Sequence, residues 1–201
     1  MSYMHPSFYY PELTDDRLKM LAERLLDLRY STIQSMNHEY DDNYTRETTV
    51  FGRTRQMLIS LALSKKYDWL ELKSPAMDVT ISIGSVPVRY FCDNPSNPEK
   101  AGYFRRNEVD QLIAIDEQQP VMWRIIVEKA LTNEDEDHVF FIGHNAYQEK
   151  ISEWVYKPST PTLHSIGQET PLSKSIGSAP VDLPDDVAKK QNDDKRTGTA
   201  E

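Results

Sequence analysis

The distribution of aromatic side chains sets the strongest limit on how this chain can fold. All 20 Phe, Tyr and Trp residues lie within residues 1–157 of the 201-residue sequence. Residues 158–201 contain none and are rich in Pro, Ser, Thr, Asp and Lys. A segment of that composition buries too little apolar surface to offset the entropy lost on ordering it. We therefore expect a single domain at 1–157 and a disordered tail at 158–201.

Charge and cysteine content narrow the class of protein further. The net charge of −9 disfavours non-specific binding to nucleic acid or anionic membranes, although it leaves room for a local basic patch. The sequence lacks an apolar run of about 18 residues and a signal-peptide pattern, so we expect no membrane association. The single cysteine, Cys92, fits a reducing compartment. These features predict a cytoplasmic protein and leave its oligomeric state open.

Two segments before residue 66 show the period of amphipathic helices. The first begins after Thr14, where Asp15 and Asp16 suit the positive end of the helix dipole. The second is predicted over about 49–64, and the run DDNYT that precedes it reads as a loop. The residues predicted to face inward are Leu18, Leu21, Ala22, Leu25 and Leu28 in the first helix, and Phe51, Leu58, Leu61 and Ala62 in the second.

The pattern then changes to the two-residue period of strands. Polar and apolar residues alternate through DVTISI and VPVRY, on either side of a two-residue turn signal, Gly84-Ser85. The predicted register pairs Ile83 with Val86, Ile81 with Val88, Val79 with Tyr90, and Thr80 with Arg89. This register leaves one apolar face and one polar face, as an antiparallel sheet with one solvated side requires. Arg89 is predicted to lie on the polar, solvent-facing side.

Three more strands are predicted near the end of the domain, in VMWRIIVEKAL, HVFFIGH and KISEWVY. HVFFIGH is apolar on both sides and should therefore lie inside the sheet. An insert at about 92–120 separates these strands from the hairpin. The fold class is thus predicted to be α+β, with two N-terminal helices packed on a mostly antiparallel sheet of about five strands, a hairpin plus a three-strand meander.

Common catalytic and cofactor motifs are missing from the sequence. It contains neither of the two glycine-rich phosphate-binding motifs, G-x-x-x-x-G-K and G-x-G-x-x-G. It also lacks the paired-cysteine and H-E-x-x-H spacings of zinc sites and the G-x-S-x-G motif of serine hydrolases. His138 and His144 lie six residues apart, about 20 Å along a strand, which is too far to share a metal ion. Only Arg89 is near enough in sequence to activate the Cys92 thiol. We therefore expect no catalytic residue, no metal and no cofactor.

One catalytic pattern remains as an alternative. Glu71-x-Lys73 resembles part of the site of metal-dependent nucleases of the restriction-enzyme fold, where a Glu and a Lys share one strand face beside a second carboxylate. The upstream Asp41 and Asp42 are separated from this pair by a predicted helix. Asp78 with Glu128-Lys129 fits less well, because adjacent strand residues point to opposite faces.

Residues 87–108 combine basic and aromatic side chains in a turn-rich stretch, and FGRTRQ adds two arginines. Arginine forks bind phosphates and carboxylates, and aromatic rings stack on bases or peptides. The alternative is that Tyr103 and Phe104 anchor the loop while the arginines form ion pairs within the domain. The residues predicted to contact a partner are Arg53, Arg55, Arg89, Lys100, Tyr103, Arg105 and Arg106.

Three classes of function follow from these observations. The favoured one is a non-enzymatic protein-binding or regulatory module, comparable to small accessory proteins of bacteria and their phages. Its partner is expected to be another protein, with nucleic acid as a possibility. The alternatives are a Mg-dependent nuclease or nucleic-acid-binding protein, and an acidic inhibitor that mimics nucleic acid. Residues 1–157 carry 18 Lys and Arg against 25 Asp and Glu, an acidic excess that is modest for a mimic.

The tail leads to a direct test. Limited proteolysis should trim the chain to near Lys157, and the trimmed domain should keep the melting temperature of the full chain, because a segment without a core adds no packing. Calorimetry on both forms measures this. A large fall in melting temperature on truncation would show that the tail packs on the domain.

Overall fold

The computed structural model describes residues 3–106, 108, 118–130 and 135–157. The predicted tail lies outside these residues, so its disorder stays a prediction. The helices are α1 (Pro6–Tyr9), α2 (Asp15–Ser35) and α3 (Asn43–Leu63). The strands are β1 (Leu70–Ser74), β2 (Thr80–Ile83), β3 (Val86–Cys92), β4 (Met122–Glu128), β5 (His138–His144) and β6 (Lys150–Val155).

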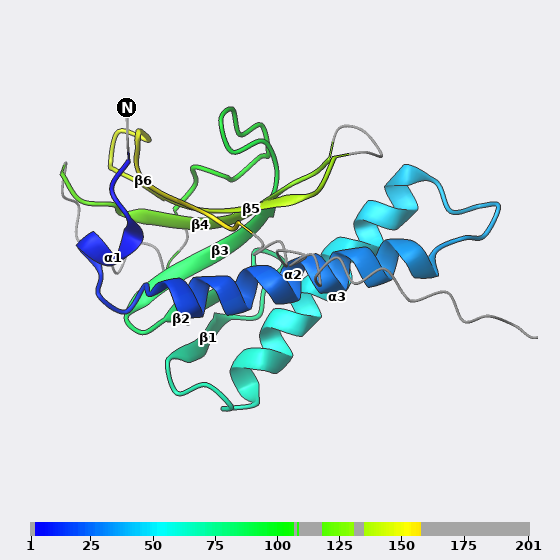
Figure 1. The fold of residues 1–201 in the computed structure, drawn as a ribbon, viewed down its shortest axis with the longest axis horizontal. Coiled ribbons are helices and arrows are strands. Elements are labelled where there is room, and N and C mark those ends of the chain that lie inside the picture. The colour runs from blue at the N-terminus through cyan, green and yellow to red at the C-terminus, as the bar shows by residue number, and fades with distance from the viewer. Residues whose placement is uncertain (1–2, 107, 109–117, 131–134, 158–201) are drawn as a thin grey trace, which may run out of the picture. The chain divides into compact units, whose positions relative to one another are not determined.

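The strands form a single sheet in the order β1-β2-β3-β4-β5-β6. Every neighbouring pair is antiparallel except β3 and β4, which run parallel and therefore need a crossover connection. The long helices lie on one side of the sheet and the connection between β3 and β4 lies on the other (Figure 1). The predicted α+β class is confirmed, with six strands rather than about five. The additional strand is β1, a short edge strand.

The two long helices pack on the sheet through the leucine faces that the sequence predicts. Leu18, Leu21 and Leu25 of α2 and Leu58 of α3 are buried in one cluster with the sheet. The predicted start of α3 is wrong by about six residues. The Asp42 carboxylate accepts a hydrogen bond from the Thr45 N–H at 2.7 Å and so caps the helix within the DDNYT run that was predicted as a loop. Among the described residues, no helix is both long and apolar enough to cross a membrane.

The predicted hairpin register is confirmed for three of its four pairs, and the fourth, Val79 with Tyr90, lies beyond the start of β2. Ile83 pairs with Val86, Ile81 with Val88 and Thr80 with Arg89. The turn works because Gly84 adopts φ +59°, a left-handed conformation that costs glycine little. The predicted three-strand meander is also present as β4, β5 and β6.

The sheet is covered on both faces, which explains the continuous apolar runs in its middle strands. Trp123, Ile125 and Val127 of β4 lie in the core cluster between the sheet and the helices. The opposite face carries a smaller cluster in which Ile126 and Ile142 pack against Tyr103 from the β3–β4 connection. A strand buried on both sides loses the alternation of a half-solvated strand.

An ion-pair network around the buried Arg29 joins the C-terminal part of α2 to the N-terminal part of α3 and to residues that flank β4 and β5. The Arg29 guanidinium donates to both Glu47 carboxylate oxygens at 2.9 and 3.1 Å and to Asp137 at 2.7 Å. Lys129 adds a contact to Glu47 at 3.3 Å. Burial acts to raise the pKa of Glu47, but the hydrogen bond and charge of Arg29 outweigh it and hold that pKa below its usual value. Glu47 therefore stays ionised and holds α3 against α2 and the end of β4.

Two glycines give opposite expectations for stability. A Cβ at Gly143 would lie 2.8 Å from the Trp123 ring and 2.9 Å from Pro120 Cβ, so we expect Gly143→Ala to lower the free energy of unfolding by about 1–3 kcal/mol through overpacking. Gly52 lies inside α3 with nothing within 4 Å of an added Cβ, so Gly52→Ala should raise it by about 0.5–1 kcal/mol. Urea unfolding of both variants measures the two effects. Equal effects of the two substitutions would contradict this packing.

Candidate partner-binding cleft

The connection from β3 to β4 is described at residues 93–106, 108 and 118–121, which we call the crossover segment, and it covers the face of the sheet opposite the long helices. Tyr103 is its anchor: only 1% of the side chain is exposed, and its ring packs against those of Phe91, Phe104 and His144 at centroid distances of 4.8–5.5 Å. Tyr103 therefore has the role of loop anchor that the sequence offered as the alternative, while its contact with a partner stays a prediction.

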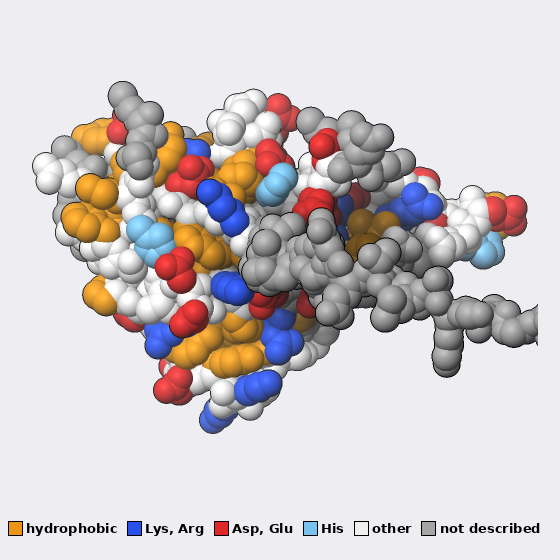
Figure 2. All heavy atoms as spheres, in the orientation of Figure 1, with side chains coloured by type: hydrophobic (Ala, Val, Ile, Leu, Met, Phe, Trp, Pro, Cys, Tyr) orange, Lys and Arg blue, Asp and Glu red, His pale blue; other side chains and the backbone are white. Residues whose placement is uncertain are grey.

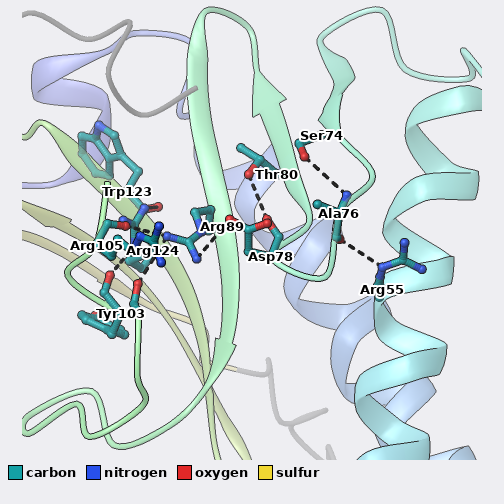
Figure 3. Close-up of polar contacts among 11 residues, drawn as sticks. Arg55, Ser74, Ala76, Asp78, Thr80, Arg89, Tyr103, Arg105, Trp123 and Arg124 are labelled. Atoms are coloured by element: carbon teal, nitrogen blue, oxygen red, sulfur yellow. Dashed lines mark hydrogen bonds and ion pairs between the residues drawn. The ribbon is translucent and has the colours of Figure 1, made fainter. Parts of the chain in front are cut away.

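Two buried arginines hold the crossover segment by its backbone (Figure 3). Arg89 of β3 donates to the carbonyl oxygens of Arg105 at 2.7 Å and Gly102 at 3.3 Å. Arg124 of β4 donates to the carbonyl of Tyr103 at 3.1 Å. Because these two arginines sit side by side in the parallel register of β3 and β4, they act on neighbouring carbonyls of the same segment.

The structure corrects the prediction that Arg89 faces solvent. Arg89 does lie on the polar face of the hairpin, as the register required, but only 5% of it is exposed because the crossover segment covers that face. Its guanidinium also lies 3.5 Å from the Asp78 carboxylate and over the Phe91 ring at 5.1 Å. Arg89 therefore positions the wall of a site and presents little surface of its own.

The two arginines of α3 do not join this cluster. Arg53 donates to the Thr32 and Ser35 hydroxyls at 3.2 Å and so joins α3 to α2. Arg55 donates to the carbonyls of Pro75 and Ala76 in the β1–β2 connection (Figure 3). Arg55 thereby fixes the loop that carries Met77 and Asp78, which contribute to the cleft described next.

A cavity of about 700 Å³ opens between the β1–β2 connection and the crossover segment. Four cationic side chains line it, those of Lys73, Arg89, Arg105 and Arg106, together with the carboxylates of Asp78 and Glu108. Lys73 and Arg105 are exposed, whereas Arg89 is buried in the floor. We call this the basic cavity. It brings together three of the predicted contact residues, Arg89, Arg105 and Arg106.

The next cavity along the sheet, of about 510 Å³, lies between α3 and the end of β3, and the predicted Lys100 contributes to it. Its walls are mostly apolar and include Phe51, Met77, Tyr90 and Phe91. Burial raises the pKa of the Tyr90 hydroxyl above its usual value. The Cys92 thiol also lines this cavity, and burial raises its pKa as well, which opposes formation of a reactive thiolate. We call this the apolar cavity.

His144 closes the packing behind the crossover segment. Burial, followed by the charges of Arg124 and Lys150, lowers its pKa to about 3, so the imidazole is neutral at physiological pH. Its ring meets those of Tyr103 and Phe104 edge-on at 5.5 and 5.3 Å. His144 thus contributes an apolar contact that helps to seat the anchor residues.

The structure shows where the residues of the nuclease pattern lie, and the nuclease alternative itself stays a prediction. Glu71 and Lys73 lie on the exposed edge strand β1 and pair with each other at 2.5 Å, while Asp42 is used as a helix cap. In the described parts of the chain, no group of three or more His, Cys, Asp or Glu side chains is arranged to hold a metal ion.

The sequence did not lead us to predict that Lys73 lines the basic cavity or that Arg124 holds the crossover segment in place. Arg124 carried a signal, because an arginine in the apolar strand VMWRIIVE must find buried acceptors. Lys73 carried none beyond its charge, since only the tertiary structure places the end of β1 and Arg105 around the same cavity.

The two roles of arginine in the cleft can be separated by measuring stability. Arg89→Glu should lower the free energy of unfolding by about 3–5 kcal/mol, because it buries an unpaired charge against carbonyl oxygens. Arg105→Glu should change it by no more than about 0.5 kcal/mol, because that side chain is exposed, whereas the bonds to Arg89 and Gly102 are made by the Arg105 backbone. Chemical unfolding monitored by circular dichroism compares the two, and similar losses would disprove the division of roles.

The comparisons with known proteins do not assign this cleft to a family. The chain matches no protein-family model, and neither a curated protein nor a solved structure matches it. Its function must therefore be argued from the geometry and charge of the cleft itself.

Proposed function

We propose that this protein is a non-enzymatic binding module that holds an acidic segment of a partner protein in the basic cavity. The observation that carries the proposal is the convergence of exposed Lys73 and Arg105 on one cavity from two separate elements, over the buried Arg89. Guanidinium and ammonium groups held around a concave site are suited to carboxylates.

Hydrogen bonds that fix both walls of the basic cavity favour a site that is already formed before a partner binds. Arg89 and Arg124 fix the crossover segment, and Arg55 fixes the opposite wall by binding the carbonyls of Pro75 and Ala76. A wall that is already ordered loses less conformational entropy when a partner binds. The cleft therefore needs no large rearrangement to accept a segment of chain.

A protein partner is favoured over nucleic acid by the acidic charge of the domain as a whole. The domain has an acidic excess, and on the face shown in Figure 2 the Lys and Arg side chains are interspersed with Asp and Glu. A long phosphate backbone would meet repulsion outside the cavity, whereas a short acidic segment would not. The same mixed charges do not form a continuous acidic surface on that face, as a nucleic-acid mimic would need.

Binding of a labelled peptide of eight aspartates, followed by fluorescence anisotropy, tests the proposal on the full chain. We expect saturable binding that weakens with salt, and an affinity loss of about tenfold in Arg105→Glu, because reversal replaces an attraction with a repulsion. Arg53→Glu is the matched control, since Arg53 lies on α3 and lines neither cavity described above, and it should bind like wild type.

Two results would overturn this proposal. One is equal binding by wild type and Arg105→Glu. The other is tighter, Arg105-dependent binding of a 12-nucleotide single-stranded DNA, which would assign the basic cavity to nucleic acid instead.

A further inference from the structure

The basic cavity is one end of a longer groove. It shares Met77, Asp78, Arg89 and Ala101 with the apolar cavity, so the two adjoin. The apolar cavity in turn shares Cys92, Lys100 and Lys129 with a third cavity of about 480 Å³ at the ends of β3 and β4. The three cavities therefore follow one another along the same edge of the domain.

The third cavity is the acidic end of this groove. Four carboxylates line it, those of Asp93, Glu128, Asp135 and Glu136, against the ammonium groups of Lys100 and Lys129. Lys129 is already paired with Glu47 at 3.3 Å. We call this the acidic cavity. The charge along the groove thus changes from positive, through apolar, to negative.

The middle of the groove is suited to an apolar side chain. Tyr44 and Met77 line it and are 77% and 69% exposed, which leaves two large apolar side chains facing solvent at its mouth. The charged groups in its walls have partners in the domain: Glu47 binds Arg29, and Asp78 lies against Arg89. An apolar side chain placed there would cover exposed apolar surface without leaving these charges unpaired.

We propose that one extended peptide segment fills all three cavities, with acidic residues in the basic cavity, a bulky apolar residue in the middle and basic residues in the acidic cavity. This inference rests on the proposed function and adds the sequence pattern of the partner. Charge complementarity at both ends carries it, because the acidic cavity has four carboxylates against two lysines, and this excess of negative charge would repel a segment that is acidic throughout. An extended peptide is the occupant that can place three side-chain types in a row.

The test uses labelled 12-residue peptides, which span about 40 Å when extended. The parent peptide has four aspartates, a glycine, a leucine-tryptophan pair, a glycine and four lysines, and it is made in both chain directions. Three derivatives replace the aspartates, the leucine-tryptophan pair or the lysines with serines. We expect the parent to bind tightest in one direction, and each replacement to weaken binding at least fivefold.

Variants of the full chain assign each part of the peptide to a cavity. Glu136→Lys should remove the advantage of the lysine peptide over its serine derivative, and a peptide with glutamates in place of the lysines should restore binding. Tyr44→Ser and Met77→Ser should each remove most of the advantage of the leucine-tryptophan pair. The matched controls lie outside the groove: Glu39→Lys for charge, and Tyr40→Ser, whose side chain is 76% exposed.

The outcomes separate this inference from the proposed function. If binding depends on Arg105 and the aspartates but is unchanged when the leucine-tryptophan pair or the lysines are replaced, the three-part pattern is wrong and the acidic-segment function stands. If no peptide binds in an Arg105-dependent way, both are wrong. If the leucine-tryptophan pair matters equally in wild type, Tyr44→Ser and Met77→Ser, the apolar residue binds elsewhere and the inference falls.

Discussion

The hydrogen bonds from Arg89 and Arg124 to the backbone of the crossover segment are the interaction on which the cleft depends. Parallel pairing of β3 and β4 requires a long connection, and that connection must cross one face of the sheet. Arginines are suited to hold it, because each guanidinium has several donors and can satisfy carbonyls that no strand pairs. Without these bonds the second face of the sheet would have no fixed cover and the basic cavity no wall.

The basic residues of the cleft therefore have two roles: some fix the backbone of its walls, and others are exposed to a partner. Arg89, Arg124 and Arg55 donate to backbone carbonyls, while Lys73 and Arg105 are exposed at the rim. On the other side of the groove, Arg29 fixes Glu47 and so holds α3 in place. The walls of the groove are thus set by charged groups that are themselves hydrogen-bonded within the domain, which is consistent with a preformed surface for a partner.

Much of the fold followed from periodicity and turn chemistry. The leucine faces of α2 and α3, the register of the β2–β3 hairpin around Gly84 and the meander of β4, β5 and β6 were all predicted from local patterns. The start of α3 and strand β1 were not. The α3 start depends on one capping bond from Asp42, and β1 is a short edge strand whose LELKS pattern is weak until β2 pairs with it.

The sequence by itself determined the two long helices, five of the six strands and the face of the hairpin on which Arg89 lies, because these follow from the spacing of apolar residues along the chain. Only the tertiary structure decided that this face is buried, since burial depends on where a distant segment crosses the sheet. It also decided which cations meet: Lys73 and Arg105 converge while Arg53 binds α2. Contacts between segments far apart in sequence leave no local period, so the pattern of residues 87–108 pointed to Arg89, Arg105 and Arg106 but not to the cavity that they form with Lys73.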